Sequence, residues 1–298
     1  MATKNDPYRI NPSEQQGALP GRARVFMPKV TMCELFALSS RDPATVTLSL
    51  DVFAKRGGLT GPHKDGWGIA YYDDGDVTLI RDVAPASESP WTPFVADRQL
   101  RSHMVVSHIR KATTGAVCLK NTQPFTRELG GVRHVFAHNG FLNGVEALFD
   151  PGNARCRPVG DTDSEIAFCI LMNRMAEIWG GDAPPSADDR ATVFHAFAGR
   201  MRDLGPANFL YADGEFLYAH ANRRHQADGE IKPPGLHTLA RTCPVEGGSL
   251  ADDGFSIGSL NQRVVLFASI PLTDEDWRPL DEGEVVIVGN GDEWGGIA

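Results

Sequence analysis

Short apolar segments joined by turns rich in Asp and Gly recur along this 298-residue chain. Two pairs of such segments stand out: 67–72 and 77–81 flank Asp73-Asp74-Gly75-Asp76, and 208–211 and 216–220 flank Ala212-Asp213-Gly214. Turns of this composition join neighbouring strands into β-hairpins. The chain is therefore expected to build antiparallel sheets.

Further strands and three helices complete the predicted elements. The strands are expected at 35–40, 104–108, 132–138, 264–269 and 284–288. Asp42-Pro43 is expected to cap a helix over 46–55, and Thr162 or Asp163 a helix over 165–179 that is apolar on most of its surface. A third helix is expected over 188–204. Together these elements predict an α+β fold in which helices sandwich antiparallel sheets within one domain.

Composition excludes several classes of function. The net charge of −9 argues against non-specific binding to nucleic acid or to anionic membranes. No apolar run approaches the roughly 20 residues that span a bilayer. Five cysteines without a C-x-x-C pair suit a reducing compartment, which predicts a cytoplasmic protein. His134 and His138 lack matching cysteines, so no metal site is expected.

The first 32 residues differ from the rest. They are polar and rich in turns, and they contain no apolar core of a secretory signal. Three interpretations stay open: a flexible leader, a propeptide, or a start codon placed too early, with Met27 and Met32 as alternative starts. We therefore expect 1–32 to be one of these three and a single domain over 33–298.

Cys33 follows a methionine at the point where the regular pattern begins. If the residues before it are removed, Cys33 gains a free α-amine with a pKa of about 8. Such an amine can act as the base that activates the neighbouring thiol. The structural alternative is a buried cysteine at the start of a strand.

Arg110 lies just after the predicted strand 104–108 and precedes Thr113, Thr114 and Gly115. A guanidinium grips a carboxylate with two parallel hydrogen bonds, and hydroxyl and backbone groups fill the remaining acceptors. The segment therefore predicts a carboxylate-binding corner. A surface arginine beside a turn is the alternative.

Two more polar segments end or begin predicted elements. Asn139-Gly140 follows the strand 132–138 and is either a simple turn or an oxyanion hole formed by the Asn139 amide and the Gly140 N–H. Asp163 stands at the start of a helix, where a carboxylate is commonly a cap. If Asp163 is not the cap, it is available to hold the α-ammonium of an amino-acid substrate.

Taken in order, these segments resemble one protein family. MCELFALS, HIRKATTG, AHNG and GDTDSE are similar to the four signatures of the class II glutamine amidotransferases, which are N-terminal-nucleophile hydrolases. GPHKDGWGIAYY, NTQPFTREL and ASIPLT resemble the compact YafJ-like and EgtC-like branch of that family. The resemblance runs from Met32 to about Val288 and implies a four-layer αββα sandwich with two antiparallel sheets between helical layers.

The resemblance also implies roles for single residues. Cys33 is expected to be the nucleophile, with its freed α-amine as general base. Asn139 and Gly140 are expected to form the oxyanion hole. The substrate's α-carboxylate is expected on Arg110, helped by Thr113 or Thr114, and its α-ammonium on Asp163. No metal or organic cofactor is expected.

Lys111 and Gln123 depart from the pattern of the synthase-linked members, which have tryptophan and histidine there; those members also carry a histidine near Thr114. The loop closure and ammonia-channel gating of those enzymes are therefore not carried over to this chain.

The expected activity is hydrolysis of a γ-glutamyl amide, with glutamate and ammonia or an amine as products. The partner is a small γ-glutamyl molecule, with a separate ammonia-accepting protein as a further option.

Two alternative functions stay open. One is a non-catalytic γ-glutamyl-binding or regulatory module, if Cys33 is not N-terminal. The other is a thiol hydrolase with His108 or His138 as base.

Overall fold

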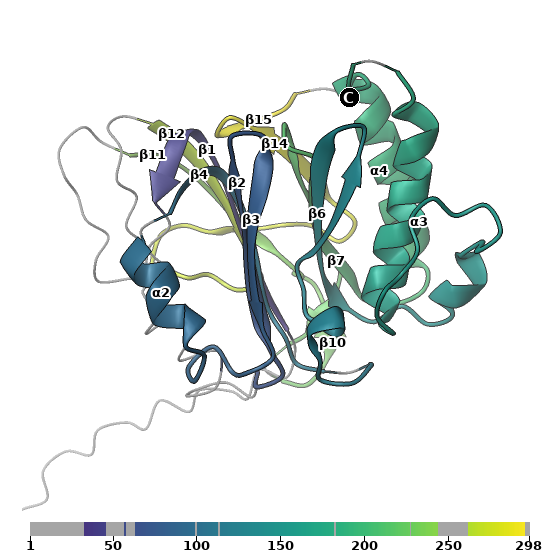
Figure 1. Cartoon of the computed structure of the whole chain (residues 1–298). Helices are drawn as coiled ribbons and strands as arrows, with labels where there is room; N and C mark the ends of the chain where they lie inside the picture. The colour runs from purple at the N-terminus through teal and green to yellow at the C-terminus, as the bar shows by residue number, and fades with distance from the viewer. Residues whose placement is uncertain are drawn as a thin grey trace, which may run out of the picture.

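Two antiparallel β-sheets pack face to face at the centre of the computed structural model (Figure 1). The structure describes residues 33–45, 57, 63–98, 100–112, 114–181, 183–226, 228–243 and 262–295. The helix expected over 46–55 lies outside these residues, as do Thr113 and the segment 1–32.

The first sheet has seven strands in the order β13-β11-β12-β1-β4-β2-β3. Its strands are β1 (Glu34–Thr45), β2 (Trp67–Asp73), β3 (Asp76–Asp82), β4 (Arg101–Ile109), β11 (His237–Cys243), β12 (Gln262–Ala268) and β13 (Arg278–Pro279). All pairings in this sheet are antiparallel, and β2 and β3 form the first hairpin expected from the sequence.

The second sheet has six strands in the order β15-β14-β8-β7-β6-β5. Its strands are β5 (Phe125–Leu129), β6 (Val132–Gly140), β7 (Ala207–Ala212), β8 (Leu217–His220), β14 (Val285–Gly289) and β15 (Asp292–Glu293). The pairing of β7 with β8 confirms the second expected hairpin. A separate two-stranded ribbon joins β9 (Arg224–His225) to β10 (Ile231–Lys232).

Helices cover both outer faces of the sandwich (Figure 1). Next to the six-stranded sheet lie α3 (Asp163–Ile178) and α4 (Ala187–Arg202), whose buried faces share a core with β5 to β8. Next to the seven-stranded sheet lies α2 (Trp91–Arg98), which adds Val95 to a second core. The short 3₁₀ helices are η2 (Leu119–Asn121) and η3 (Val145–Leu148). This arrangement confirms the predicted α+β sandwich of two sheets between helices. None of the helices in the described residues is long and apolar enough to cross a bilayer.

A third apolar layer fills the space between the sheets. Alternate residues of β1 and β4, such as Leu35, Ala37 and Val106, meet alternate residues of β6 and β7, such as Ala137 and Leu210. Because side chains alternate between the two faces of a strand, the same alternation decides which polar residues beyond this layer also point between the sheets.

One local prediction was wrong. Asp42-Pro43 was expected to begin a helix, but it belongs to β1, which continues past an irregularity to pair Ala44 with Ser102. The Asp42 N–H is bonded to the side chain of Gln262 on β12 (3.0 Å). A proline is tolerated in a strand where the ladder is interrupted in this way.

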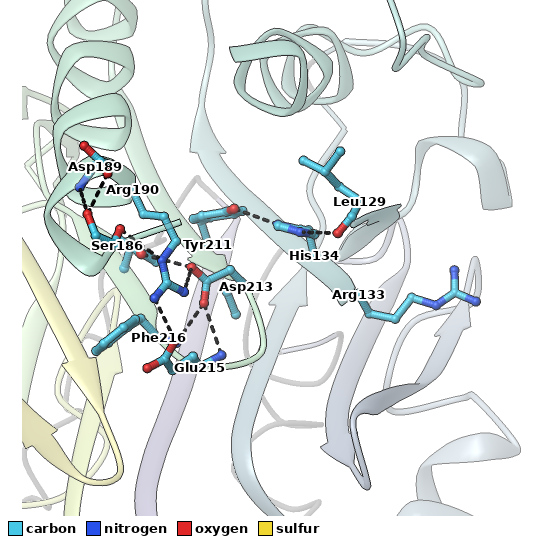
Figure 2. A network of polar contacts seen from close by, with 12 residues as sticks. Leu129, Arg133, His134, Ser186, Asp189, Arg190, Tyr211, Asp213, Glu215 and Phe216 are labelled. Atoms are coloured by element: carbon cyan, nitrogen blue, oxygen red, sulfur yellow. Dashed lines mark hydrogen bonds and ion pairs between the residues drawn. The ribbon is translucent and has the colours of Figure 1, made fainter. Parts of the chain in front are cut away.

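The β7–β8 hairpin is fixed to α4 by a buried ion pair, shown in Figure 2. Arg190 Nη1 lies 3.1 Å from Asp213 Oδ2, and both side chains are almost fully buried. Asp213 also accepts the Tyr218 hydroxyl (3.0 Å) and the backbone N–H of Phe216 (2.8 Å). Burial raises the pKa of Asp213, while the Arg190 charge lowers it. The Arg190–Asp213 ion pair is therefore stable only because neighbouring groups also hydrogen-bond to the Asp213 carboxylate.

Candidate active site

Cys33 lies immediately before β1, at the end of the sandwich where β4 finishes. The register pairs Glu34 with Ile109, so Cys33 faces the residues that follow β4. Its Sγ accepts a hydrogen bond from the Lys111 N–H (3.1 Å) and donates one to the Lys111 carbonyl (3.2 Å). The backbone of one residue therefore fixes the position of the thiol.

The surroundings of Cys33 disfavour a thiolate. Burial raises the pKa of the thiol to about 11, against the lowering effect of the Lys111 hydrogen bond and of the Arg110 charge. The nearby Asp65 charge raises the pKa further. With its amine in a peptide bond, Cys33 is therefore a neutral thiol at pH 7 and requires a base.

Asn139 brings the second sheet to the same point. It is fully buried, and it lies on β6 with the same strand parity as the residues of the layer between the sheets. Its Nδ2 donates to the carbonyl oxygen of Cys33 and to Ser269 Oγ (3.3 Å). The amide expected in the oxyanion hole is thus in contact with the expected nucleophile residue, across the space between the sheets.

The simple-turn alternative for Asn139-Gly140 is wrong. Both residues belong to β6, where Asn139 pairs with Asn208 and Gly140 with Ala207 on β7. At Gly140, φ is +155°, and a Cβ atom would lie 1.8 Å from the carbonyl oxygen of Pro206. Only glycine fits so close to a neighbouring backbone.

Arg110 directly follows β4 and is almost fully buried. Its guanidinium donates from Nη2 to the Thr114 carbonyl (2.9 Å) and from Nη1 to the Ala116 carbonyl (3.2 Å). Its backbone N–H is bonded to Gly66 O (2.8 Å). In this structure Arg110 therefore holds the 114–116 loop, part of the segment that was predicted to help it bind a carboxylate.

Asp163 meets that loop from α3. Thr162 is the N-cap, since its hydroxyl accepts the Glu165 N–H (3.3 Å), so Asp163 is not used as the cap. Asp163 Oδ1 accepts the Thr114 hydroxyl (3.0 Å), and Oδ2 accepts the Leu142 N–H (2.8 Å). The structure thus brings together three of the four expected substrate-binding residues, the fourth being Thr113, which lies outside the described residues.

The two histidines proposed as alternative bases are not hydrogen-bonded to Cys33. His138 Nδ1 is 2.9 Å from Ser164 Oγ on the helical side of β6. His108 is fully buried, and burial lowers its pKa to about 3. Among the described residues, neither of its ring nitrogens has a hydrogen-bond partner. This geometry gives no support to a Cys-His pair.

Four residues near the site had no predicted role: Asn121, Gln123, Asn208 and Ser269. Gln123 Oε1 accepts the His138 N–H (2.6 Å), and its Nε2 donates to the His138 carbonyl (3.2 Å). Ser269 Oγ accepts the Leu35 N–H (2.9 Å), two residues from Cys33. Asn121 and Gln123 belong to NTQPFTREL and Ser269 to ASIPLT, so the sequence marked these stretches without indicating what they do.

No group of three or more His, Cys, Asp or Glu side chains able to hold a metal ion occurs in the part of the chain that the structure describes. The site instead offers a thiol, an amide, a guanidinium and a carboxylate at one end of two packed sheets. Such a set can bind a charged amino acid and attack an attached carbonyl group.

Comparison with known proteins decides the family. The model of the class II glutamine amidotransferases matches residues 32–296. The chain belongs to this family. It is 37% identical over 262 residues to YafJ of Escherichia coli (strain K12), whose name describes it as a glutamine amidotransferase. The match covers 85% of this chain and 96% of that one. A glutamine amidotransferase-type protein of Haemophilus influenzae is 32% identical, with 91% and 88% covered.

Solved structures agree with this membership of the class II glutamine amidotransferases. A predicted glutamine amidotransferase from Pseudomonas aeruginosa PA01 superposes with a TM-score of 0.63 at 33% identity, covering 88% of this chain and 99% of that one. The glutamine phosphoribosylpyrophosphate amidotransferase of B. subtilis gives a TM-score of 0.56 at 14% identity. That second likeness concerns the fold alone, and it spans 48% of the larger enzyme.

Proposed function

We propose that this amidotransferase hydrolyses the γ-glutamyl amide bond of glutamine or of another γ-glutamyl compound through a thioester on Cys33. The contact between Asn139 Nδ2 and the Cys33 carbonyl carries the proposal, because it joins the expected oxyanion donor to the expected nucleophile across two sheets. Family membership supports amide chemistry, and the surroundings of Cys33 suggest how it proceeds.

The first half of the reaction forms the thioester. Because burial raises the pKa of the thiol, Cys33 needs a base. The α-amine of Cys33, once freed, takes the thiol proton. The sulfur then bonds to the γ-carbonyl carbon, and the carbonyl electron pair moves onto oxygen. That oxyanion accepts hydrogen bonds from Asn139 and from the Gly140 N–H. For this, the Asn139 amide exchanges one of its two present acceptors, of which Ser269 Oγ, at 3.3 Å, is the more weakly held.

The second half releases both products. The tetrahedral intermediate collapses, the C–N bond breaks, and the leaving ammonia or amine takes the proton from the Cys33 ammonium. Water then attacks the thioester with the amine as base, which yields glutamate and restores the thiol.

Selectivity for the γ-glutamyl group comes from two opposite charges. Arg110 is proposed to bind the α-carboxylate, with Thr114 beside it, and Asp163 the α-ammonium. The hydrogen bond between Thr114 and Asp163 supports this, because it joins the loop held by Arg110 to the first residue of α3. A substrate lacking either charge would leave one buried charged group unpaired, which is costly.

We propose stand-alone hydrolysis in the cytoplasm, with a separate ammonia-accepting protein as the alternative use of the product. Support for the location comes from Cys33, Cys118, Cys156 and Cys169, all of which are free thiols. If Cys33 stays in peptide linkage, Arg110, Thr114 and Asp163 are expected to bind γ-glutamyl compounds without turnover.

The test compares two forms of the protein whose N-termini are verified by intact mass: one beginning at Cys33 and one retaining the preceding residues. Glutamate release from glutamine and from a panel of γ-glutamyl amines and peptides is measured, with Cys33→Ala as control. We expect turnover only in the form that begins at Cys33, rising with pH as the amine deprotonates near pH 8. Turnover in Cys33→Ala, or equal turnover in both forms, would contradict the mechanism.

A further inference from the structure

We propose that Asn121 is a positioning residue that sets the separation between the two charged halves of the substrate clamp, and so determines the preference for a free α-amino acid group. This inference rests on the proposed function. It concerns a residue that contacts neither Cys33 nor the reacting amide, and it assigns Asn121 a role in substrate selection.

Asn121 bridges two loops through the two ends of its side-chain amide. Its Nδ2 donates to the carbonyl oxygen of Ala116 (3.0 Å), and its Oδ1 accepts the N–H of Asp161 (2.9 Å). The side chain is fully buried. An amide is suited to this position because it offers a donor and an acceptor in one rigid plane.

Each bridged loop carries one half of the proposed clamp. Ala116 lies in the loop that the Arg110 guanidinium also holds, so it belongs to the carboxylate half. Asp161 lies two residues before Asp163, which supplies the ammonium half. The Asn121 amide therefore connects the arginine loop to the aspartate loop.

Other links between the loops are weaker. The Thr114 hydroxyl reaches Asp163 through one hydrogen bond (3.0 Å), whereas the fully buried Asn121 side chain makes two. Lys120 Nζ lies 2.7 Å from Asp161 Oδ2, but both side chains are largely exposed, and such surface pairs contribute little because water screens them. The buried two-ended bridge is thus the connection best able to fix the distance between the loops.

Two glycines make room for the amide, one on each loop. A Cβ atom on Gly115 would lie 2.8 Å from Asn121 Nδ2, and one on Gly160 would lie 2.2 Å from Asn121 Oδ1. Such close approach requires that both neighbours lack a side chain. The Asn121 amide is therefore tightly packed against both glycines, and a side chain added at either one is expected to shift the loops.

The experiment measures selectivity, which does not depend on the amount of folded enzyme. For the active form beginning at Cys33, kcat/KM is determined for a γ-glutamyl anilide and for the matching glutaryl anilide, which keeps the carboxylate but lacks the α-ammonium. In Asn121→Ala we expect KM for the γ-glutamyl anilide to rise about tenfold, kcat to stay within about threefold, and the γ-glutamyl to glutaryl ratio to fall at least tenfold.

Gly160→Ala perturbs the same bridge from the aspartate loop without removing Asn121. Its φ is not in the left-handed region, so the added methyl group acts through its contacts: Asn121 Oδ1 (2.2 Å), the Lys120 carbonyl oxygen (2.8 Å) and Glu165 Oε2 (2.9 Å). We expect the same fall in the ratio. Combining Gly160→Ala with Asn121→Ala should add little, because both changes break one connection.

Asn173→Ala is the matched control. Asn173 Oδ1 accepts the N–H groups of Arg155 and Cys156 (both 2.9 Å), so it also fastens a loop through its amide, but one that carries no part of the clamp. Its ratio should equal that of the wild type. An unchanged ratio in Asn121→Ala, or an equal fall in Asn173→Ala, would overturn the proposal. If the wild-type protein releases no product from any γ-glutamyl compound, the proposed function fails instead.

Discussion

Gly140→Ala tests whether the end of β6 has to approach the neighbouring backbone as closely as it does here. The new Cβ atom would lie 1.8 Å from Pro206 O, whereas ordinary contacts lie at 3.4–4 Å. The two chain segments must therefore move apart by roughly 1.5 Å, because a backbone carbonyl cannot rotate away as a long side chain can. Pro206 is held there by the Phe141 N–H (3.2 Å), so the shift also disturbs the residue after Gly140.

The expected loss of activity follows from that displacement. A misplacement of about 1 Å in a catalytic group can cost about 100-fold, and loss of one oxyanion donor costs about 100- to 1,000-fold. We expect kcat of Gly140→Ala to fall by about 100- to 1,000-fold. KM should change less, because the Arg110 guanidinium is held by the Thr114 and Ala116 carbonyls, which are not part of β6.

Glutamate release and thermal unfolding are measured together, with Gly131→Ala as the matched control at the opposite end of β6. Gly131 also has positive φ (+78°), but its Cβ would meet nothing within 4 Å. It should lose about 1 kcal/mol of stability and no activity. Asn139→Ala removes the other donor without a backbone clash and should show a comparable fall in kcat. A folded Gly140→Ala with kcat within threefold of wild type would refute the argument.

Two further predictions concern stability. Asp213→Ala leaves the buried Arg190 with Glu215 as its one remaining ionic partner among the described residues and should lower the free energy of unfolding by about 3 kcal/mol in urea titrations. Because Asp213 follows the end of β7 remote from Gly140, kcat per folded molecule should be unchanged, and a tenfold fall would contradict this. The second prediction uses His108, whose pKa is about 3 when folded and about 6.5 when unfolded. Below pH 6.5 only the unfolded state gains the proton, so this group should reduce stability by up to about 1.4 kcal/mol per pH unit until about pH 3. His108→Leu should flatten the fall between pH 6.5 and 5, and an equal slope in both proteins would contradict the assignment.

Local sequence pattern was sufficient to predict most of the sandwich. The two Asp-Gly hairpins, and the segments 104–108 and 132–138 that form β4 and β6, are short apolar runs, and the hairpins are marked by clear turns. By contrast, β5 (Phe125–Leu129) was missed because FTREL is polar and lies at a sheet edge, where one face and one side of the strand meet solvent. β11 (His237–Cys243) was missed for a similar reason, since its polar residues alternate with only a few apolar ones.

The candidate site was predictable as a set of residues but not as a geometry. Cys33 and Asn139 are 106 residues apart, and only the packing of two sheets brings them into contact. The same holds for Asn121 and Asp161, which meet through a side chain and a backbone group. Propensity and periodicity describe what one segment does, so they cannot indicate which polar side chain will fill a gap between two others.

The layer between the sheets suggests why the site lies where it does. Over most of its length this layer is apolar, but at one end Asn139 and His108 replace the aliphatic residues. Among the described residues, Asn139 Oδ1 and both ring nitrogens of His108 have no hydrogen-bond partner. A buried polar group without a partner costs about 1–3 kcal/mol, so an apolar residue in place of His108 would give a more stable sandwich. The Asn139 amide contacts Cys33 at this end, as the proposed chemistry requires. Substitutions that stabilise the protein here are expected to reduce its activity.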